Sequence, residues 1–236
     1  MLRALLFLLF FIPWTLVCAL SAIIFTLFDS SGRSYHAHAR LWSWLALKVG
    51  GTRLKVTGTE QIPGGQPLIF MGNHQGNFDI LALFHAVPRR FTWMAKEGLF
   101  KVPVVGYSMR RAGYISLDRG NSSAAIKSME NAAAAIRGGA SVIVFPEGTR
   151  THDGSLRPFK KGGFHLAIKA GVPIIPFTIN GSRRINPRNR MELHPGELSI
   201  HFGAPIPTAG SAGEQPAELM DLMEQVRLAI ASHLKV

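Results

Sequence analysis

The sequence predicts an α/β fold: a single, largely parallel (mixed) sheet flanked by helices, preceded by an N-terminal membrane-embedded helical segment. Three observations predict it. Short apolar runs alternate with helical patterns beyond about residue 50. Several of these runs are apolar throughout, as expected of strands that helices cover on both faces. Before them stands a long apolar run without a charged side chain, residues 4–28.

The apolar run 4–28 predicts a membrane anchor. As a straight helix it would extend ~37 Å, which exceeds the roughly 30 Å core of a bilayer. Pro13 lies inside the run and removes a backbone donor, so we expect a kink or a break into two shorter helices. A tilted single span and a re-entrant helical hairpin both remain open. A cleaved signal peptide is disfavoured, because the run exceeds a usual apolar core and no A-x-A-like site follows it.

Residues 29–50 mix basic, histidine and tryptophan side chains, which is typical of a helix at the membrane–water interface. We therefore assign residues 1–50 to the anchor and interfacial helices, and residues 51–236 to the α/β domain. Arginine and lysine are more frequent just after the apolar run than before it, where only Arg3 stands. This bias predicts an inner (cytoplasmic) membrane protein whose main domain faces the cytoplasm.

The chain is strongly basic. Its 26 Lys and Arg residues outnumber its 14 Asp and Glu residues, which gives a net charge of +12. Such a charge indicates an anionic partner, and the apolar segment favours an anionic membrane lipid or a phosphorylated substrate. Nucleic acid is not expected, because the basic residues are scattered or follow strands instead of forming a run interleaved with aromatic residues.

Metal and thiol chemistry are not expected either. The single cysteine, Cys18, lies in the apolar run, which excludes disulfides, thiolate-rich metal sites and a cysteine nucleophile outside that run. His36 and His38 form the closest histidine pair, but no third ligand has a recognisable spacing and no H-E-x-x-H motif occurs. A metallohydrolase is therefore disfavoured.

The α/β domain is expected to contain strands at residues 67–71, 90–95, 113–117, 141–145, 172–179 and 198–202. Helices are expected at residues 121–137, at 160–170 and at 216–230. In open α/β sheets ligands bind beyond the carboxyl ends of the strands. Polar residues that directly follow the expected strands are therefore the candidates for a functional site.

The first candidates, His74 and Asp79, follow the first expected strand. A neutral imidazole can take a proton from a hydroxyl, and a nearby carboxylate fixes its tautomer and stabilises the imidazolium that forms. On a regular helix the two side chains would lie ~140° apart, which is too far for contact. We expect Gly72 and Gly76 to permit a turn through which Asp79 folds back to His74. Taken alone, an H-x4-D spacing is more often structural than catalytic.

Cationic side chains follow three further strands. Arg150 ends the segment FPEGTR (145–150), where a guanidinium suits bidentate binding of phosphate and Glu147 can orient it or contact a substrate hydroxyl. Arg119 follows the third expected strand, and Lys96 follows the second. Each alone would be a surface charge by default, but four strand ends that carry polar or cationic groups indicate one site.

Four segments together resemble the glycerolipid acyltransferase family. NHQGNFD (73–79) matches its N-H-x4-D signature, and FPEGTR (145–150) resembles its third block in full. GYISLDR (113–119) is similar to the second block, and VPIIPFTI (172–179) is similar to the proline-bearing fourth. Their order and spacing also agree with the family.

Within this family, the short length and the N-terminal apolar segment resemble the 1-acylglycerol-3-phosphate (lysophosphatidic acid) acyltransferases. The resemblance implies transfer of a fatty acyl chain from acyl-CoA or acyl-carrier protein to the sn-2 hydroxyl of lysophosphatidic acid, which gives phosphatidic acid. His74 is then the general base, Asp79 orients it, and residues 51–236 form the catalytic domain. The implied substrate-binding residues are Glu147, Gly148, Thr149 and Arg150, with Arg119 and Lys96 as further phosphate ligands. No metal or cofactor is implied, because the acyl donor is a co-substrate. No acyl-enzyme is needed either, and a serine intermediate remains open.

The acceptor is less defined than the reaction. Gly98 stands at a position that is often acidic in the family, and Ser116-Leu117 replaces the common Phe-Ile before Asp-Arg. Both departures leave donor and acceptor selectivity open. The alternative is another lysolipid acceptor, such as a lyso-ornithine lipid or a lysophospholipid with a larger headgroup. No motif reports the acyl chain length, the donor or the oligomeric state.

Overall fold

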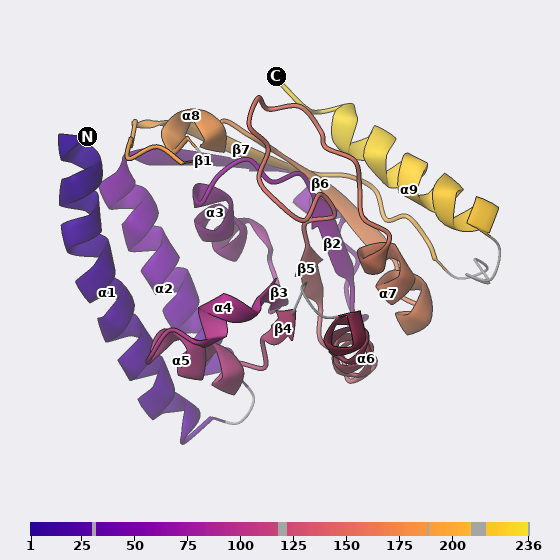
Figure 1. Cartoon of the computed structure of the whole chain (residues 1–236), viewed down its shortest axis with the longest axis horizontal. Helices are drawn as coiled ribbons and strands as arrows, with labels where there is room; N and C mark the ends of the chain where they lie inside the picture. The colour runs from indigo at the N-terminus through magenta and orange to yellow at the C-terminus, as the bar shows by residue number, and fades with distance from the viewer. Residues whose placement is uncertain (30–31, 118–121, 188, 209–215, 236) are drawn as a thin grey trace.

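The computed structural model describes residues 1–29, 32–117, 122–187, 189–208 and 216–235. It contains a seven-stranded sheet in the order β1-β7-β6-β2-β5-β3-β4 (Figure 1). The strands are β1 (Thr52–Thr57), β2 (Ile69–Gly72), β3 (Thr92–Lys96), β4 (Ile115–Leu117), β5 (Val142–Val144), β6 (Ile174–Asn180) and β7 (Gly196–Phe202). Only the β6–β7 pair among these strands is antiparallel. The predicted fold class, a largely parallel mixed sheet, is confirmed.

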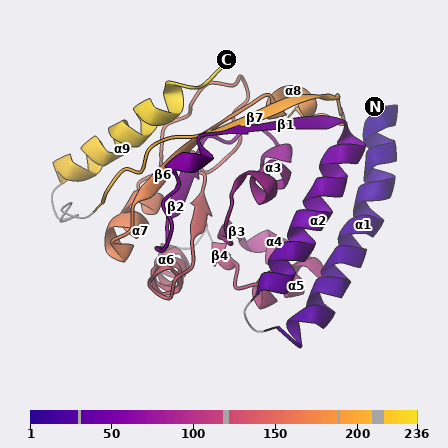
Figure 2. The ribbon, with the colours of Figure 1, turned by 180° about the vertical axis from the view of Figure 1, so that it is seen from behind.

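Helices cover both faces of the sheet (Figures 1 and 2). They are α1 (Leu2–Thr26), α2 (Arg33–Gly50), α3 (Phe78–Ala86), α4 (Glu97–Phe100), α5 (Val105–Arg111), α6 (Ser122–Arg137), α7 (Gly162–Ala170), α8 (Ser182–Ile185) and α9 (Pro216–Ala231), with a short 3₁₀ helix at Thr59–Gln61. One apolar core lies between the sheet and α1, α2, α3 and α8. A second core lies between the sheet and α6, α7 and α9.

Strand β2 shows why the apolar runs predict buried strands. Phe70 points into the core beneath α2 and α3, whereas Ile69 and Met71 point into the core beneath α6 and α7. All three side chains are fully buried. Because successive residues of a strand face opposite sides, a strand covered on both faces must be apolar at every position.

The sequence did not predict β1, which pairs in parallel with β7. Its residues alternate between half-buried and exposed, and Arg53 and Lys55 occupy exposed positions. With one face open to solvent, this edge strand carries too few apolar residues to be recognised as a run.

Helices α1 and α2 form an antiparallel hairpin at one side of the domain, with α1 outermost (Figures 1 and 2). Trp42 donates its indole N–H to Thr15 Oγ1 at 2.9 Å, and Arg3 donates to the carbonyl of Gly50 at 3.2 Å. Helix α1 continues through Pro13, so the predicted break into two helices does not occur. These contacts hold α1 against α2 on both sides of the proline, which keeps the helix in one piece.

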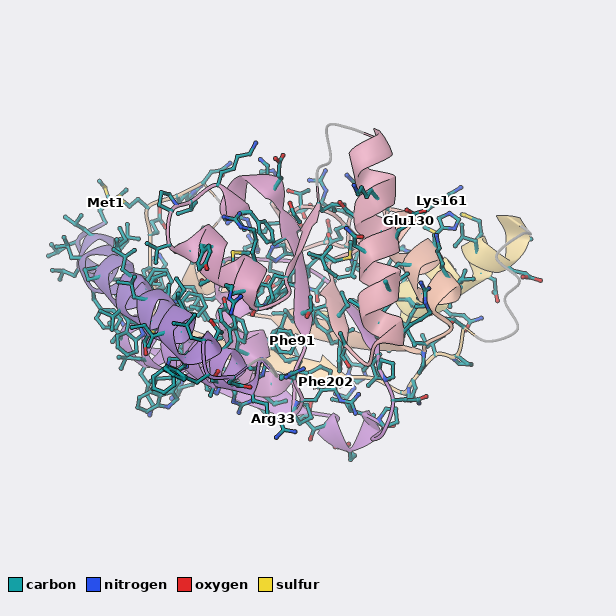
Figure 3. All side chains as sticks on the ribbon, turned by 90° about the horizontal axis from the view of Figure 1, so that it is seen from below. Met1, Arg33, Phe91, Glu130, Lys161 and Phe202 are labelled. Atoms are coloured by element: carbon teal, nitrogen blue, oxygen red, sulfur yellow. The ribbon has the colours of Figure 1, made fainter. Side chains whose placement is uncertain are left out.

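Most of the surface of α1 faces away from the protein. Figure 3 shows its side chains projecting outward along the side of the molecule where Met1 is labelled. Within the described residues, α1 is the one helix long and apolar enough to cross a membrane. Ten large apolar side chains of α1 are exposed and would contact water in the absence of a membrane. The outward surface of α1 therefore indicates membrane association.

Candidate active site

The loop that carries His74, residues 73–77, begins where β2 ends. Asn73 is buried, donates through Nδ2 to the carbonyl of Ile179 at 2.8 Å, and accepts from the N–H of Ile179 at 2.7 Å. Through these two bonds the Asn73 side chain extends the pairing of β2 with β6 by one residue beyond Gly72. Asn73 therefore fixes the direction in which the chain leaves the sheet and places His74 at its carboxyl edge.

The structure brings His74 and Asp79 together. Nδ1 of His74 lies 2.6 Å from Oδ2 of Asp79, and the carboxylate is fully buried. The same oxygen accepts from the backbone N–H groups of Gln75 at 2.7 Å and Gly76 at 2.9 Å. An ionised carboxylate can only accept, so the imidazole proton lies on Nδ1 and Nε2 keeps its lone pair. The pair thus has the geometry of a general base and its orienting partner.

Gly72 and Gly76 are required for their small size and not for unusual backbone angles. Neither Gly72 nor Gly76 has a positive φ, in contrast to the expected glycine-permitted turn. A Cβ on Gly72 would overlap the ring and carbonyl oxygen of Phe177, and one on Gly76 would lie 2.9 Å from Ser182 Oγ. The turn back to Asp79 is made possible by close packing against β6 and α8.

An aromatic side chain supports the imidazole from one side. The rings of His74 and Phe145 stack with centroids 4.0 Å apart and an interplanar angle of 8°. Phe145 in turn packs against Trp93 and Phe177 at centroid distances of 5.9 Å and 6.1 Å. The imidazole plane is therefore fixed by packing as well as by its hydrogen bond.

A cavity of about 1090 Å³ opens beside His74. Its wall includes polar and cationic side chains, among them Lys96, Asn77, Thr149, Arg150 and Lys160. Apolar side chains of β3 and of helices α1, α2 and α5 also line it, among them Ala19, Ala22, Trp42, Trp93 and Met109. The cavity can therefore hold a molecule that has an anionic end and a long apolar portion.

Most of the residues implied to bind phosphate line this cavity. Gly148, Thr149, Arg150 and Lys96 are among its wall residues, together with His74. Arg150 donates to Asn77 Oδ1 at 2.6 Å, which places the guanidinium beside the loop that carries His74. Arg119 lies outside the described residues, so its predicted role stays a prediction.

Of the wall residues, Asn77 lacked a role in the sequence interpretation, and Lys160 was considered only as an addition to the positive charge at Arg150 or as a solvated helix start. Asn77 holds Arg150 and donates to Asn186 Oδ1 at 2.9 Å. Lys160 approaches Gly148, whose φ of +70° suits glycine, and a Cβ there would lie 3.0 Å from Lys160 Cε. Both are polar residues next to the predicted motifs, but their contacts join distant segments, which no local pattern reports.

Glu147 has two backbone partners inside the protein. Its Oε1 accepts from the N–H of His74 at 2.9 Å, its Oε2 accepts from the N–H of Arg157 at 3.0 Å, and only 3% of the residue is exposed. Burial raises the pKa of the Glu147 carboxyl, and the N–H groups of Arg157 and His74 oppose that rise. Glu147 thus holds the backbone of the loop that carries His74 in place. Direct contact of Glu147 with substrate stays a prediction.

We expect Glu147→Gln to lower kcat about tenfold, because the amide NH₂ cannot accept from one of the two backbone N–H groups, a loss of roughly 1–3 kcal/mol at a buried site. The KM for the acceptor should change little. Steady-state kinetics compared with Glu130→Gln, at an exposed position on α6, check this expectation. A raised acceptor KM with an unchanged kcat would instead assign Glu147 to substrate contact.

The fold and the site define an α/β protein with a His–Asp pair at the carboxyl edge of its sheet, in which Asp79 is buried and His74 reaches the cavity. The profile of the Acyltransferase family matches residues 53–180, which is more than half of the chain. The chain belongs to this acyltransferase family, and the predicted family is confirmed.

Named relatives agree with this assignment. Human "1-acyl-sn-glycerol-3-phosphate acyltransferase alpha" is 33% identical over 181 residues, which cover 76% of this chain and 64% of the human protein. The chloroplastic 1-acyl-sn-glycerol-3-phosphate acyltransferase BAT2 of Brassica napus is 33% identical over 183 residues, which cover 76% of this chain and 53% of that protein. The chain thus matches between about half and two thirds of the length of these relatives.

A solved structure matches almost the whole fold. The crystal structure of the 1-acyl-sn-glycerophosphate (LPA) acyltransferase PlsC from Thermotoga maritima superposes with a TM-score of 0.80 at 28% sequence identity. The match covers 95% of this chain and 93% of that one, so it includes the N-terminal helices as well as the sheet.

Proposed function

We propose that this protein transfers a fatty acyl chain from acyl-CoA or acyl-carrier protein to the sn-2 hydroxyl of 1-acylglycerol-3-phosphate, which gives phosphatidic acid. The observation that carries the proposal is the His74–Asp79 pair at a cavity whose wall contains both cationic and apolar side chains. A lysophosphatidic acid has the same two parts, a phosphate and a long acyl chain. The names of the relatives support this acceptor.

In the proposed reaction Nε2 of His74 takes the proton of the sn-2 hydroxyl. The hydroxyl oxygen attacks the thioester carbonyl, a C–O bond forms, and the C–S bond breaks. The leaving thiolate receives the proton from the imidazolium, so the enzyme returns to its starting state. Asp79 stabilises the imidazolium while it exists, at an Oδ2–Nδ1 distance of 2.6 Å. No metal or cofactor takes part in this scheme.

The cationic part of the cavity would hold the acceptor phosphate. Arg150 and Lys96 supply positive charge to the cavity that contains His74, and Arg119 is a further proposed ligand by family resemblance. A guanidinium suits two phosphate oxygens at once, which orients the glycerol and brings its hydroxyl to His74. We further propose that residues 1–50 anchor the enzyme to the inner membrane and that the catalytic domain, residues 51–236, faces the cytoplasm.

An acceptor panel tests the proposed function. Purified protein with one acyl donor is offered lysophosphatidic acid, lyso-ornithine lipid and lysophospholipids with larger headgroups. We expect the highest kcat/KM for lysophosphatidic acid, because its phosphate monoester is the most anionic and least crowded headgroup. Preference for lyso-ornithine lipid would replace the proposed acceptor while leaving the acyltransferase reaction in place.

We expect Arg150→Ala to raise the KM for lysophosphatidic acid by about 10- to 100-fold, because a charge-assisted hydrogen bond contributes roughly 1.5–3 kcal/mol. The kcat should change less, since His74 and Asp79 remain bonded. Arg53→Ala on the exposed edge strand is the matched control. An unchanged acceptor KM in Arg150→Ala would count against a phosphate role.

A further inference from the structure

A second exposed apolar surface is formed by residues outside the N-terminal helix. The segment from α4 to α5, residues 97–111, exposes three large apolar side chains: Leu99 at 49%, Val102 at 44% and Tyr107 at 48%. Exposed cationic residues stand among them, namely Lys101, Arg110 and Arg111. Apolar tips flanked by positive charge are typical of protein surfaces that lie at the boundary between lipid headgroups and acyl chains.

This segment is continuous with the outward face of α1. Helix α5 packs against α1, and Figure 1 shows α4 and α5 in front of the α1–α2 hairpin. Arg111 donates to the carbonyl of Thr26 at 3.2 Å, near the end of α1, where Phe25 and Leu27 are exposed. A bilayer that receives the exposed side of α1 would therefore meet the α4–α5 segment as well.

The connection between the two helices is strained. Val104 has φ of +64° and ψ of −60°, and the N–H of Val105 donates to the carbonyl of Pro103 at 2.6 Å, which closes a three-residue turn. A positive φ is uncommon for a β-branched residue and costs on the order of 1–3 kcal/mol. Strain of this kind persists where the surrounding structure fixes the turn, and here the turn follows directly on the exposed Val102.

The inner side of the same segment forms part of the cavity wall. Leu99, Val105 and Met109 line the cavity that contains His74, whereas Val102 and Tyr107 do not. Residues 97–111 thus separate the cavity from the exposed apolar surface. A lipid that moves from a bilayer into the cavity past this segment would travel along an apolar path.

We propose that residues 97–111 are a second membrane-contacting element, which places the cavity against a bilayer containing anionic lipid. Val102 and Tyr107 enter the interface, and Lys101, Arg110 and Arg111 contact lipid phosphates. Lys101 also pairs with Glu97 at 3.0 Å, an exposed contact that is weak enough to exchange for a lipid phosphate. The inference rests on the proposed function, because it explains how a lysolipid reaches His74 from a membrane.

Site-specific labels test the contact directly. In a Cys18→Ala background, Val102→Cys, Leu9→Cys on α1 and Leu228→Cys on α9 each receive an environment-sensitive fluorophore. The protein is then mixed with phosphatidylcholine–phosphatidylglycerol vesicles, with and without nitroxide groups on the acyl chains. Leu9 and Leu228 are 64% and 60% exposed, so both controls are accessible to the label.

We expect the labels at positions 102 and 9 to shift to shorter emission wavelengths and to be quenched by the nitroxide lipids, while the label at 228 does neither. A label at 102 that behaves like the one at 228 would overturn the proposal. A wavelength shift without lipid quenching would also overturn it, and would identify a second copy of the chain as the occupant.

Activity measurements separate this inference from the proposed function. We expect Val102→Asp/Tyr107→Asp to lose about tenfold or more of the wild-type rate on lysophosphatidic acid embedded in vesicles, because carboxylates oppose insertion into the interface. The rate on a short-chain, monomeric lysophosphatidic acid should not change. Met220→Asp/Leu228→Asp on α9 is the control, with both native side chains exposed. Equal rates on embedded acceptor would refute the inference, whereas an inactive wild type would refute the proposed function.

Discussion

Replacing His74 with alanine is expected to lower kcat by about 10²- to 10⁴-fold, the usual contribution of a general base. The His74 imidazole is hydrogen-bonded to the Asp79 carboxylate and also forms part of the cavity wall. The fold should be preserved, because the backbone of His74 keeps its bonds to Glu147 and to the N–H of Thr151. Asp79 likewise keeps two backbone donors.

The measurement is acyl transfer by detergent-solubilised protein, with thermal unfolding of the same samples to verify the fold. His165→Ala, at an exposed position on α7, is the matched control and should retain wild-type activity. If His74→Ala keeps more than a small fraction of the activity, the assignment of the general base is wrong.

Replacing Asp79 with asparagine is expected to lower kcat by about 10³-fold while the geometry survives. The donors from His74, Gln75 and Gly76 all reach one oxygen, Oδ2, and the other oxygen, Oδ1, has no hydrogen-bond partner within the described residues. An asparagine carbonyl in place of Oδ2 can keep these bonds, so His74 retains its tautomer. What is lost is the negative charge beside the imidazolium, worth about 4 kcal/mol at 4 Å with an effective dielectric constant of 20.

The kinetics of Asp79→Asn distinguish charge from geometry. The KM for the acceptor should stay close to the wild-type value, because the phosphate-binding side chains are untouched. Asp79→Ala should be at least as impaired, since it also frees the imidazole. Asp221→Asn, at an exposed position on α9, is the control. A kcat of Asp79→Asn near that of the wild type would show that the buried carboxylate has no electrostatic role.

The sheet was largely predictable because its central strands are covered on both faces. Ile69, Phe70 and Met71 are all fully buried, so a simple apolar run reports the strand. Strand β1 was missed because Arg53 and Lys55 face solvent. Continuity of α1 through Pro13 was also unpredictable, since it depends on contacts with α2 that are remote in sequence.

The site was predictable as a set of residues but not as a geometry. The sequence places His74 and Arg150 after strands, and the parallel pairing of β2 with β5 brings both segments to one edge of the sheet. The turn that joins His74 to Asp79 depends on space left beside Phe177 and Ser182, which lie about a hundred residues away. The bracing contacts of Glu147 are of the same long-range kind.

We propose that His74 and Asp79 activate a lysophosphatidic acid hydroxyl for direct attack on a thioester. Thiol release and lipid products are measured when purified protein receives acyl-CoA or acyl-carrier protein separately, each with and without lysophosphatidic acid. We predict thiol release only when lysophosphatidic acid is present, in equal amount with phosphatidic acid, from at least one donor. Stoichiometric thiol release without the acceptor, with the acyl group retained on the protein, would contradict direct attack and would show an acyl-enzyme instead.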